Sequence, residues 1–104
     1  MLVQVNTDRN IEGSAALAER VEATLREALE RFSGRITRIE VHLSDHNSAK
    51  GGANDKRCVL EARLAGLKPI AVSHEAATIW QAVDGATRQL ERSLDSTLGR
   101  LRGH

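Results

Sequence analysis

The sequence predicts a two-layer α+β domain in which two helices pack on one face of a four-stranded mixed sheet, in the order βαβββα. Hydrophobic residues repeat with period two in four short segments and with the helical period in two longer ones. The chain has 104 residues, which is enough for one modest hydrophobic core and too few for two. We therefore expect residues 1–104 to form a single domain.

The first half of the chain reads as strand, helix and strand. Residues 2–6 alternate between apolar and polar positions, which is typical of a strand. Ser14 suits the N-cap of a helix that ends before Ser33 and Gly34. Its apolar stripe consists of Leu17, Val21, Leu25, Ala28, Leu29 and Phe32. Residues 37–44 return to period two, and a strand–helix–strand order favours parallel pairing of the two strands.

The second half begins with a long loop and two further strands. Residues 45–55 contain no apolar side chain larger than alanine and include Gly51 and Gly52, so we expect a flexible loop. Residues 56–64 and 68–73 alternate as strands do. Pro69 has no N–H to donate to a neighbouring strand, which favours an edge position for the last strand.

A long helix is predicted from about Glu75 to Leu101, with Ser73 as its N-cap and Glu75 in its first turn. Such a helix would approach about 40 Å, longer than the rest of the domain is wide. We therefore expect its last turns to project or to dock on a partner. The apolar stripe consists of Ile79, Ala82, Val83, Ala86, Leu90, Leu94, Leu98 and Leu101.

Composition excludes several classes of protein. The longest apolar runs are far shorter than a membrane span, and the N-terminus lacks the pattern of a signal peptide. The single cysteine, Cys58, excludes a disulfide framework and a multi-cysteine zinc site. Cys58 is expected to be a small buried hydrophobic residue. These observations favour a cytoplasmic protein without a membrane partner.

The sequence contains no convincing catalytic or metal-binding pattern. Ser73, His74 and Glu75 are adjacent, and adjacent side chains rarely converge as a nucleophile and its base must. A metal-dependent enzyme built on His42, His46 and Asp45 is a minor alternative. We expect no catalytic residue, no bound metal and no cofactor.

The charge pattern permits binding to a polyanion. The net charge is only +1, but residues 1–34 carry −2 and residues 35–104 carry +3. Each arginine alone is also explained as a solvated surface residue, and Arg100 and Arg102 suit the end of a helix dipole. Together, the basic side chains suit a phosphate backbone. The candidate RNA-binding residues are Arg35, Arg38, Lys56, Arg57, Arg88, Arg92, Arg100 and Arg102.

Two segments carry a family resemblance that spans nearly the whole chain. One is residues 29–36 leading into residues 40–43, and the other is residues 79–85 followed by residues 90–94. The second contains an aromatic residue followed by Ala82, Val83 and Asp84, and then a Leu-x-Arg-x-Leu pattern. In these motifs and in element order, the chain resembles the short ribosome hibernation-promoting factors and ribosome-associated translation inhibitors.

This resemblance implies a non-enzymatic function. Such a protein would occupy the decoding channel of the small ribosomal subunit and inhibit translation under stress or in stationary phase. Its basic side chains would contact ribosomal RNA phosphates, and Arg35, Arg92, Arg100 and Arg102 match positions where the family is basic. An alternative is a protein-interaction or homodimerisation module of the same fold, which would dock a partner or a second copy through Leu94, Leu98 and Leu101 of the last helix.

Overall fold

The computed structural model describes residues 1–11, 14–46 and 55–101. Within these ranges, the chain follows the predicted order of strand, helix, three strands and helix. Most of the loop predicted at residues 45–55, and residue Arg102, lie outside the described residues. The elements are β1 (Leu2–Thr7), α1 (Ser14–Ala28), the short 3-10 helix η1 (Glu30–Phe32), β2 (Ile36–Asp45), β3 (Lys56–Leu64), β4 (Ile70–Ala76) and α2 (Ile79–Leu101).

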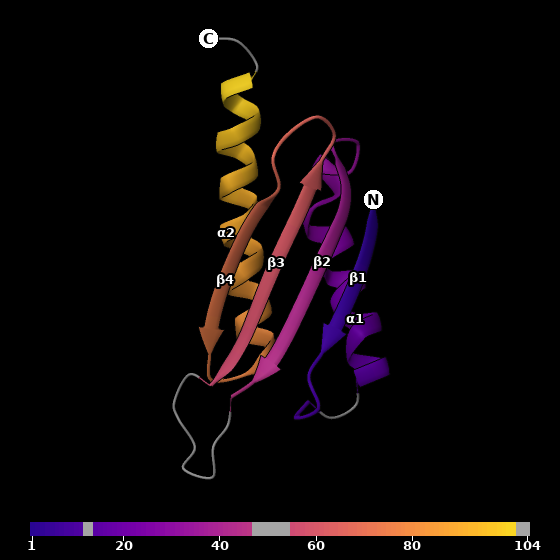
Figure 1. The fold of residues 1–104 in the computed structure, drawn as a ribbon, viewed down its shortest axis with the longest axis vertical. Helices are drawn as coiled ribbons and strands as arrows, with labels where there is room; N and C mark the ends of the chain where they lie inside the picture. The colour runs from indigo at the N-terminus through magenta and orange to yellow at the C-terminus, as the bar shows by residue number, and fades with distance from the viewer. Residues whose placement is uncertain (12–13, 47–54, 102–104) are drawn as a thin grey trace.

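The four strands form one mixed sheet in the order β1-β2-β3-β4. β1 runs parallel to β2, with Val3 opposite Ile39, and the other two pairs are antiparallel. Figure 1 shows both helices on the same side of this sheet, with α2 behind β3 and β4 and α1 towards β1. The predicted fold class is therefore confirmed. The edge position of β4 is also confirmed, and Pro69 directly precedes that strand.

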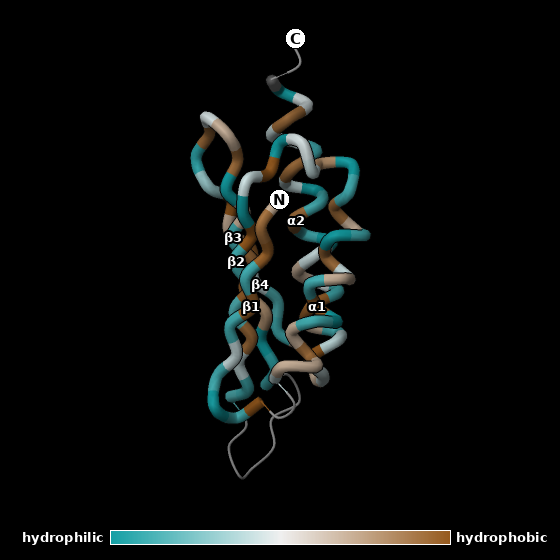
Figure 2. Tube along the Cα trace, turned by 90° about the vertical axis from the view of Figure 1, so that its right-hand side faces the viewer, coloured by the Kyte–Doolittle hydropathy of each residue, from teal (hydrophilic) through white to brown (hydrophobic). Residues whose placement is uncertain are grey.

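The hydrophobic core lies between the sheet and the two helices, which Figure 2 shows as two layers. Ile39, Leu60 and Leu90 are fully buried, because alternate side chains of the strands turn towards the apolar stripes of the helices. Phe32 and Cys58 are buried as predicted. In the described part of the chain, no helix covers the other face of the sheet, and polar side chains occupy most of it.

α1 is shorter than the predicted helix. The N–H of Leu29 still donates to the carbonyl of Leu25 at 2.9 Å, but the N–H of Phe32 donates to the carbonyl of Leu29, three residues earlier. This change to 3-10 spacing starts a tighter turn after Ala28. The turn keeps Phe32 in the core immediately before the chain enters β2.

α2 begins at Ile79, later than predicted, because β4 stays paired with β3 as far as Ala76. The predicted N-cap at Ser73 is therefore wrong, since Ser73 and Glu75 belong to β4. Thr78 takes the capping role instead: its hydroxyl oxygen accepts a hydrogen bond from the N–H of Gln81 at 3.1 Å.

The last described turns of α2 pack on the protein's own core, although the end of the helix extends past the β3–β4 connection (Figure 1). Leu94 and Leu98 are 0% and 3% exposed. These two leucines are therefore not available for the partner docking that the sequence suggested. The side chain of Leu101, the third leucine of the predicted docking surface, lies outside the described part of the chain.

Candidate nucleic-acid interface

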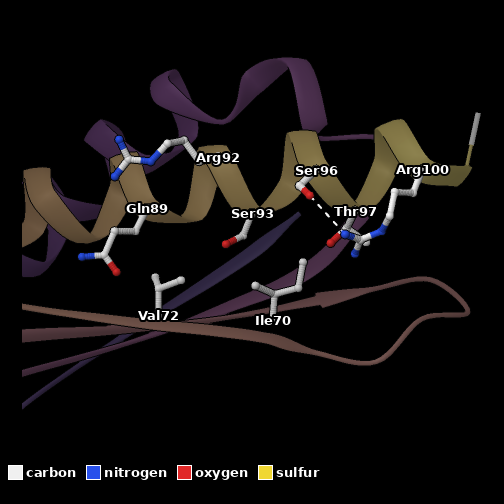
Figure 3. Close-up of a pocket in the computed structure, with 8 residues that line it drawn as sticks. All are labelled: Ile70, Val72, Gln89, Arg92, Ser93, Ser96, Thr97 and Arg100. Atoms are coloured by element: carbon white, nitrogen blue, oxygen red, sulfur yellow. Dashed lines mark hydrogen bonds between the residues drawn. The ribbon is translucent and has the colours of Figure 1, made fainter.

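One side of α2 and the edge strand β4 border an open groove of about 480 Å³. In Figure 3, Ile70 and Val72 rise from β4 towards α2, while Ser93 and Thr97 point from α2 towards the strand. We call this hollow the α2–β4 groove. It continues towards the start of α2 as a second hollow of about 330 Å³, since Gln89 and Arg92 line both parts. The lining of the first part is Ile70, Val72, Gln89, Arg92, Ser93, Ser96, Thr97 and Arg100.

Three of the predicted RNA-binding residues, Arg88, Arg92 and Arg100, lie exposed along this groove. The helix rises about 6 Å from Arg88 to Arg92 and about 12 Å from Arg92 to Arg100. Arg88 pairs with Asp84 at 3.2 Å, and Arg100 donates to the hydroxyl of Ser96 at 3.2 Å. Within residues 1–11, 14–46 and 55–101, neither Arg92 nor Arg100 pairs with a carboxylate.

The acidic side chains in the middle of α2 turn to the other side of the helix. Asp95 forms an ion pair with Arg31 of η1 at 2.7 Å, and this hydrogen bond raises the pKa of Arg31. Glu91 lines a separate hollow between α1 and α2. The part of the α2–β4 groove between Gln89 and Arg100 therefore carries two guanidinium groups and no carboxylate in its described lining. A concave surface of one charge sign attracts anions.

Two other predicted residues, Arg38 and Arg57, lie on the opposite, uncovered face of the sheet, which we call the open sheet face. The arginines of this face alternate with carboxylates, so their charges largely cancel. The neighbours are Glu40 at 3.6 Å from Arg38, Glu61 at 3.4 Å from Arg63, and Glu75 opposite Arg57 in the β3–β4 register.

Lys56 closes the end of the β2–β3 pair, away from the end of α2. Its ammonium nitrogen lies 2.9 Å from Asp55 and 3.3 Å from Asp45. The hydrogen bond between Lys56 and Asp55 raises the pKa of the lysine and lowers the pKa of the carboxyl. Because two carboxylates surround this single cation, Lys56 is placed to hold the strand ends together.

Arg35 directly precedes β2, which starts at the end of the domain where α2 finishes (Figure 1). Its carbonyl accepts a hydrogen bond from the N–H of Ala65 at 3.3 Å, next to the β3–β4 connection. That connection also carries Lys68, which is exposed and lies two residues before Ile70 of the groove. Lys68 is not among the RNA-binding residues predicted from the sequence. The available signal was a lysine beside a glycine turn, since Gly66 has a φ of 75°.

His74 lies in the second hollow, where its Nδ1 is 3.2 Å from the side-chain nitrogen of Gln89. A Cβ added at Gly85 would overlap the imidazole ring. The strand alternation turns Ser73 and Glu75 to the other face, so these three residues do not converge on one site. No group of three or more His, Cys, Asp or Glu side chains that could hold a metal ion occurs in the described part of the chain.

Nearly the whole chain matches the model of one protein family. The model of the family described as "Sigma 54 modulation protein / S30EA ribosomal protein" matches residues 4–102. The chain belongs to this family. The predicted resemblance to the ribosome hibernation-promoting factors is thereby confirmed. No curated protein sequence matches the chain.

Solved structures related to this family agree with the fold. The N-terminal domain of Protein Y from Thermus thermophilus aligns with a TM-score of 0.72 and 25% identity, over 93% of this chain and 99% of that domain. A ribosomal subunit interface protein from Coxiella burnetii aligns with a TM-score of 0.71 and 22% identity, over 95% of this chain and 99% of that one. Among the described residues, no helix is both long and apolar enough to cross a membrane.

Proposed function

We propose that this member of the family acts as a single cytoplasmic domain that binds the small ribosomal subunit in its decoding channel and inhibits translation under stress. Family membership supports a ribosomal partner. The observation that carries the proposed binding mode is the α2–β4 groove, where Arg92 and Arg100 stand beside hydroxyl donors with no carboxylate in the described lining.

The groove suits a phosphate backbone better than it suits base recognition. Guanidinium groups and hydroxyls both bind phosphate oxygens, and such contacts fix position without reading sequence. The chain has only two aromatic residues, Phe32 and Trp80. Phe32 is buried, and Trp80 lies half-buried beneath the guanidinium of Arg20, 4.9 Å from the ring centroid. Neither forms an exposed stacking platform of the kind that single-strand binders use.

Replacing the three arginines of the groove tests this proposal. The triple variant Arg88→Gln, Arg92→Gln, Arg100→Gln should lose co-sedimentation with ribosomes, because each lost phosphate contact weakens binding. The slope of log affinity against log salt should become shallower by about 0.7–0.9 for each contact removed. All three side chains are exposed, so the thermal unfolding midpoint should stay near that of the unmodified protein.

The open sheet face supplies a matched control. The variant Arg38→Gln, Arg57→Gln, Arg63→Gln removes the same charge from side chains that already have carboxylate neighbours. It should co-sediment like the unmodified protein. If this control no longer co-sediments with ribosomes while the groove variant still does, the assignment of binding to the groove is wrong and the open sheet face binds the ribosome.

Inhibition is tested separately in a purified translation system. The unmodified protein should reduce peptide synthesis, and the groove variant should not. Addition of messenger and initiator transfer RNA should displace the bound protein if all three compete for the decoding channel. Ribosome binding without displacement would place the protein elsewhere on the subunit.

A further inference from the structure

His74 and Gly85 fit one another in the second hollow of the groove. His74 is half-buried on β4, and its neighbour across the sheet is the buried Cys58 of β3. Its ring lies so close to the backbone of Gly85 that a Cβ there would overlap Cγ, Cδ2 and Nε2. Only glycine at position 85 leaves room for an imidazole in this position.

Gln89 of α2 contacts the imidazole of His74. The side-chain nitrogen of Gln89 lies 3.2 Å from Nδ1 of His74, and an amide nitrogen donates and does not accept. In the neutral ring Nδ1 is therefore the acceptor and Nε2 carries the proton, whereas in the protonated ring Nδ1 also donates and the amide oxygen of Gln89 has to turn towards it. In the described part of the chain, Nε2 has no hydrogen-bond partner, so the ring lines the hollow with an unused donor.

The charged groups that face His74 come from α2. They are Arg88, Arg92 and Asp84, of which Asp84 pairs with Arg88 at 3.2 Å. β3 contributes the Cys58 thiol, whose pKa is raised by burial to about 12, so it is neutral there. Glu75 turns to the open sheet face. Arg92 is thus the one uncompensated permanent charge among these described groups, and protonation of the imidazole adds a second.

We propose that the hollow between His74, Arg88 and Arg92 is a phosphate-binding site whose affinity increases when His74 is protonated. The inference rests on the proposed function in that ribosomal RNA would supply the phosphate, but free inorganic phosphate presents the same kind of anionic oxygen acceptors. Imidazole changes charge between about pH 5 and pH 8. Since protonation and phosphate binding favour one another reciprocally, RNA binding strengthens as the pH falls through this range.

The test measures binding of a labelled single-stranded oligouridylate at about pH 6 and about pH 8. The unmodified protein should bind about fivefold more tightly at the lower pH, the smaller end of typical coupling between two sites. Its salt slope should be steeper there by about 0.7, the value for one phosphate contact on a single strand. His74→Gln keeps a polar side chain but no titratable charge, so its affinity should be equal at the two pH values.

His42→Gln is the matched control, because His42 is exposed on the open sheet face and lies beside Glu40 at 3.9 Å. It should keep the fivefold ratio. A ratio that persists in His74→Gln, disappears in His42→Gln or is absent from the unmodified protein overturns the inference. These results are independent of ribosomes, so the phosphate site can fail while co-sedimentation succeeds, and the reverse.

A second measurement uses the unmodified protein and so avoids any loss of folding in a variant. At about pH 6, inorganic phosphate should perturb the NMR signals of the His74 imidazole and should leave those of His42 unchanged. If inorganic phosphate also displaces oligouridylate, the site accepts phosphate from either source. If only the oligonucleotide perturbs His74, the site is specific for a nucleic-acid backbone. Unchanged His74 signals with both ligands overturn the inference.

Discussion

The contact between His74 and Gly85 makes a quantitative prediction for Gly85→Ala. Glycine inside a helix costs about 1 kcal/mol relative to alanine, so the change would normally stabilise the protein. Here, the new methyl group overlaps the imidazole, which must move. Moving it loses the hydrogen bond to Gln89, about 1 kcal/mol, and strains the packing by about 1–3 kcal/mol. We therefore expect a net loss of about 1–3 kcal/mol in the free energy of unfolding.

Denaturant unfolding of the unmodified protein and four variants measures this prediction. Gly99→Ala, in the same helix, is the control, because a Cβ at Gly99 meets no described atom within 4 Å. It should stabilise the protein by up to about 1 kcal/mol. His74→Ala and the double variant His74→Ala, Gly85→Ala complete a double-mutant cycle. With the ring absent, alanine at position 85 should again be stabilising by about 1 kcal/mol.

The sign of the change in unfolding free energy caused by Gly85→Ala tests the close contact between His74 and Gly85. Stabilisation by the same amount at Gly85 and Gly99, or no coupling between positions 74 and 85, would refute the close contact. The phosphate site would then lose one of the two contacts that position the imidazole against α2, leaving only the hydrogen bond with Gln89.

Three further predictions concern stability. Burial raises the pKa of Cys58 to about 12, compared with an ordinary thiol pKa of about 8.5. The buried neutral thiol therefore stabilises the fold fully below about pH 8.5, and this contribution is lost as the pH rises towards 12. In denaturant unfolding, Cys58→Ala should lack this part of the loss of stability at alkaline pH. Leu94→Ala should cost about 2–5 kcal/mol in the same assay, because Leu94 is fully buried within the chain. Thr78→Ala should cost about 1 kcal/mol by removing the N-cap of α2.

The fold was predictable because its apolar periods match its elements. The strands bury alternate residues and the helices bury stripes, so each period identifies one element and one buried face. The boundaries failed where two patterns overlap. Ser73 and Glu75 suit a helix start by residue type, but Ala76 pairs with Lys56 across the sheet, and that pairing extends the strand. Such long-range pairing leaves no local signal.

The candidate site was predictable in its residue types but not in its charge pairing. The sequence treats Arg57 and Arg92 alike, as exposed cations. Arg57 lies opposite Glu75 because of the antiparallel register, whereas Arg92 faces a groove without a carboxylate in its described first part. Lys56 differs again, because two aspartates surround it. Register and helix orientation decide which cations remain available, and neither is encoded in the spacing of charges along the chain.

The two parts of the α2–β4 groove should contribute to binding independently. Arg100 carries a permanent charge in one part, and His74 contacts Gln89 in the other. Gln89 and Arg100 are separated by about 16 Å along the helix axis, beyond the distance at which substitutions usually couple. Arg100→Gln should therefore weaken oligouridylate binding by the same factor at about pH 6 and pH 8. His74→Gln should instead remove only the ratio between the two pH values.

The double variant His74→Gln, Arg100→Gln tests whether the two parts of the groove are independent. Its binding free energy should change by the sum of the two single changes, to within about 0.5 kcal/mol. A larger deviation would mean that binding in one part of the groove positions the oligonucleotide for the other part or that α2 shifts on binding. In either case, the groove would act as a single site, and Arg100 would belong to the pH-dependent part of the interface.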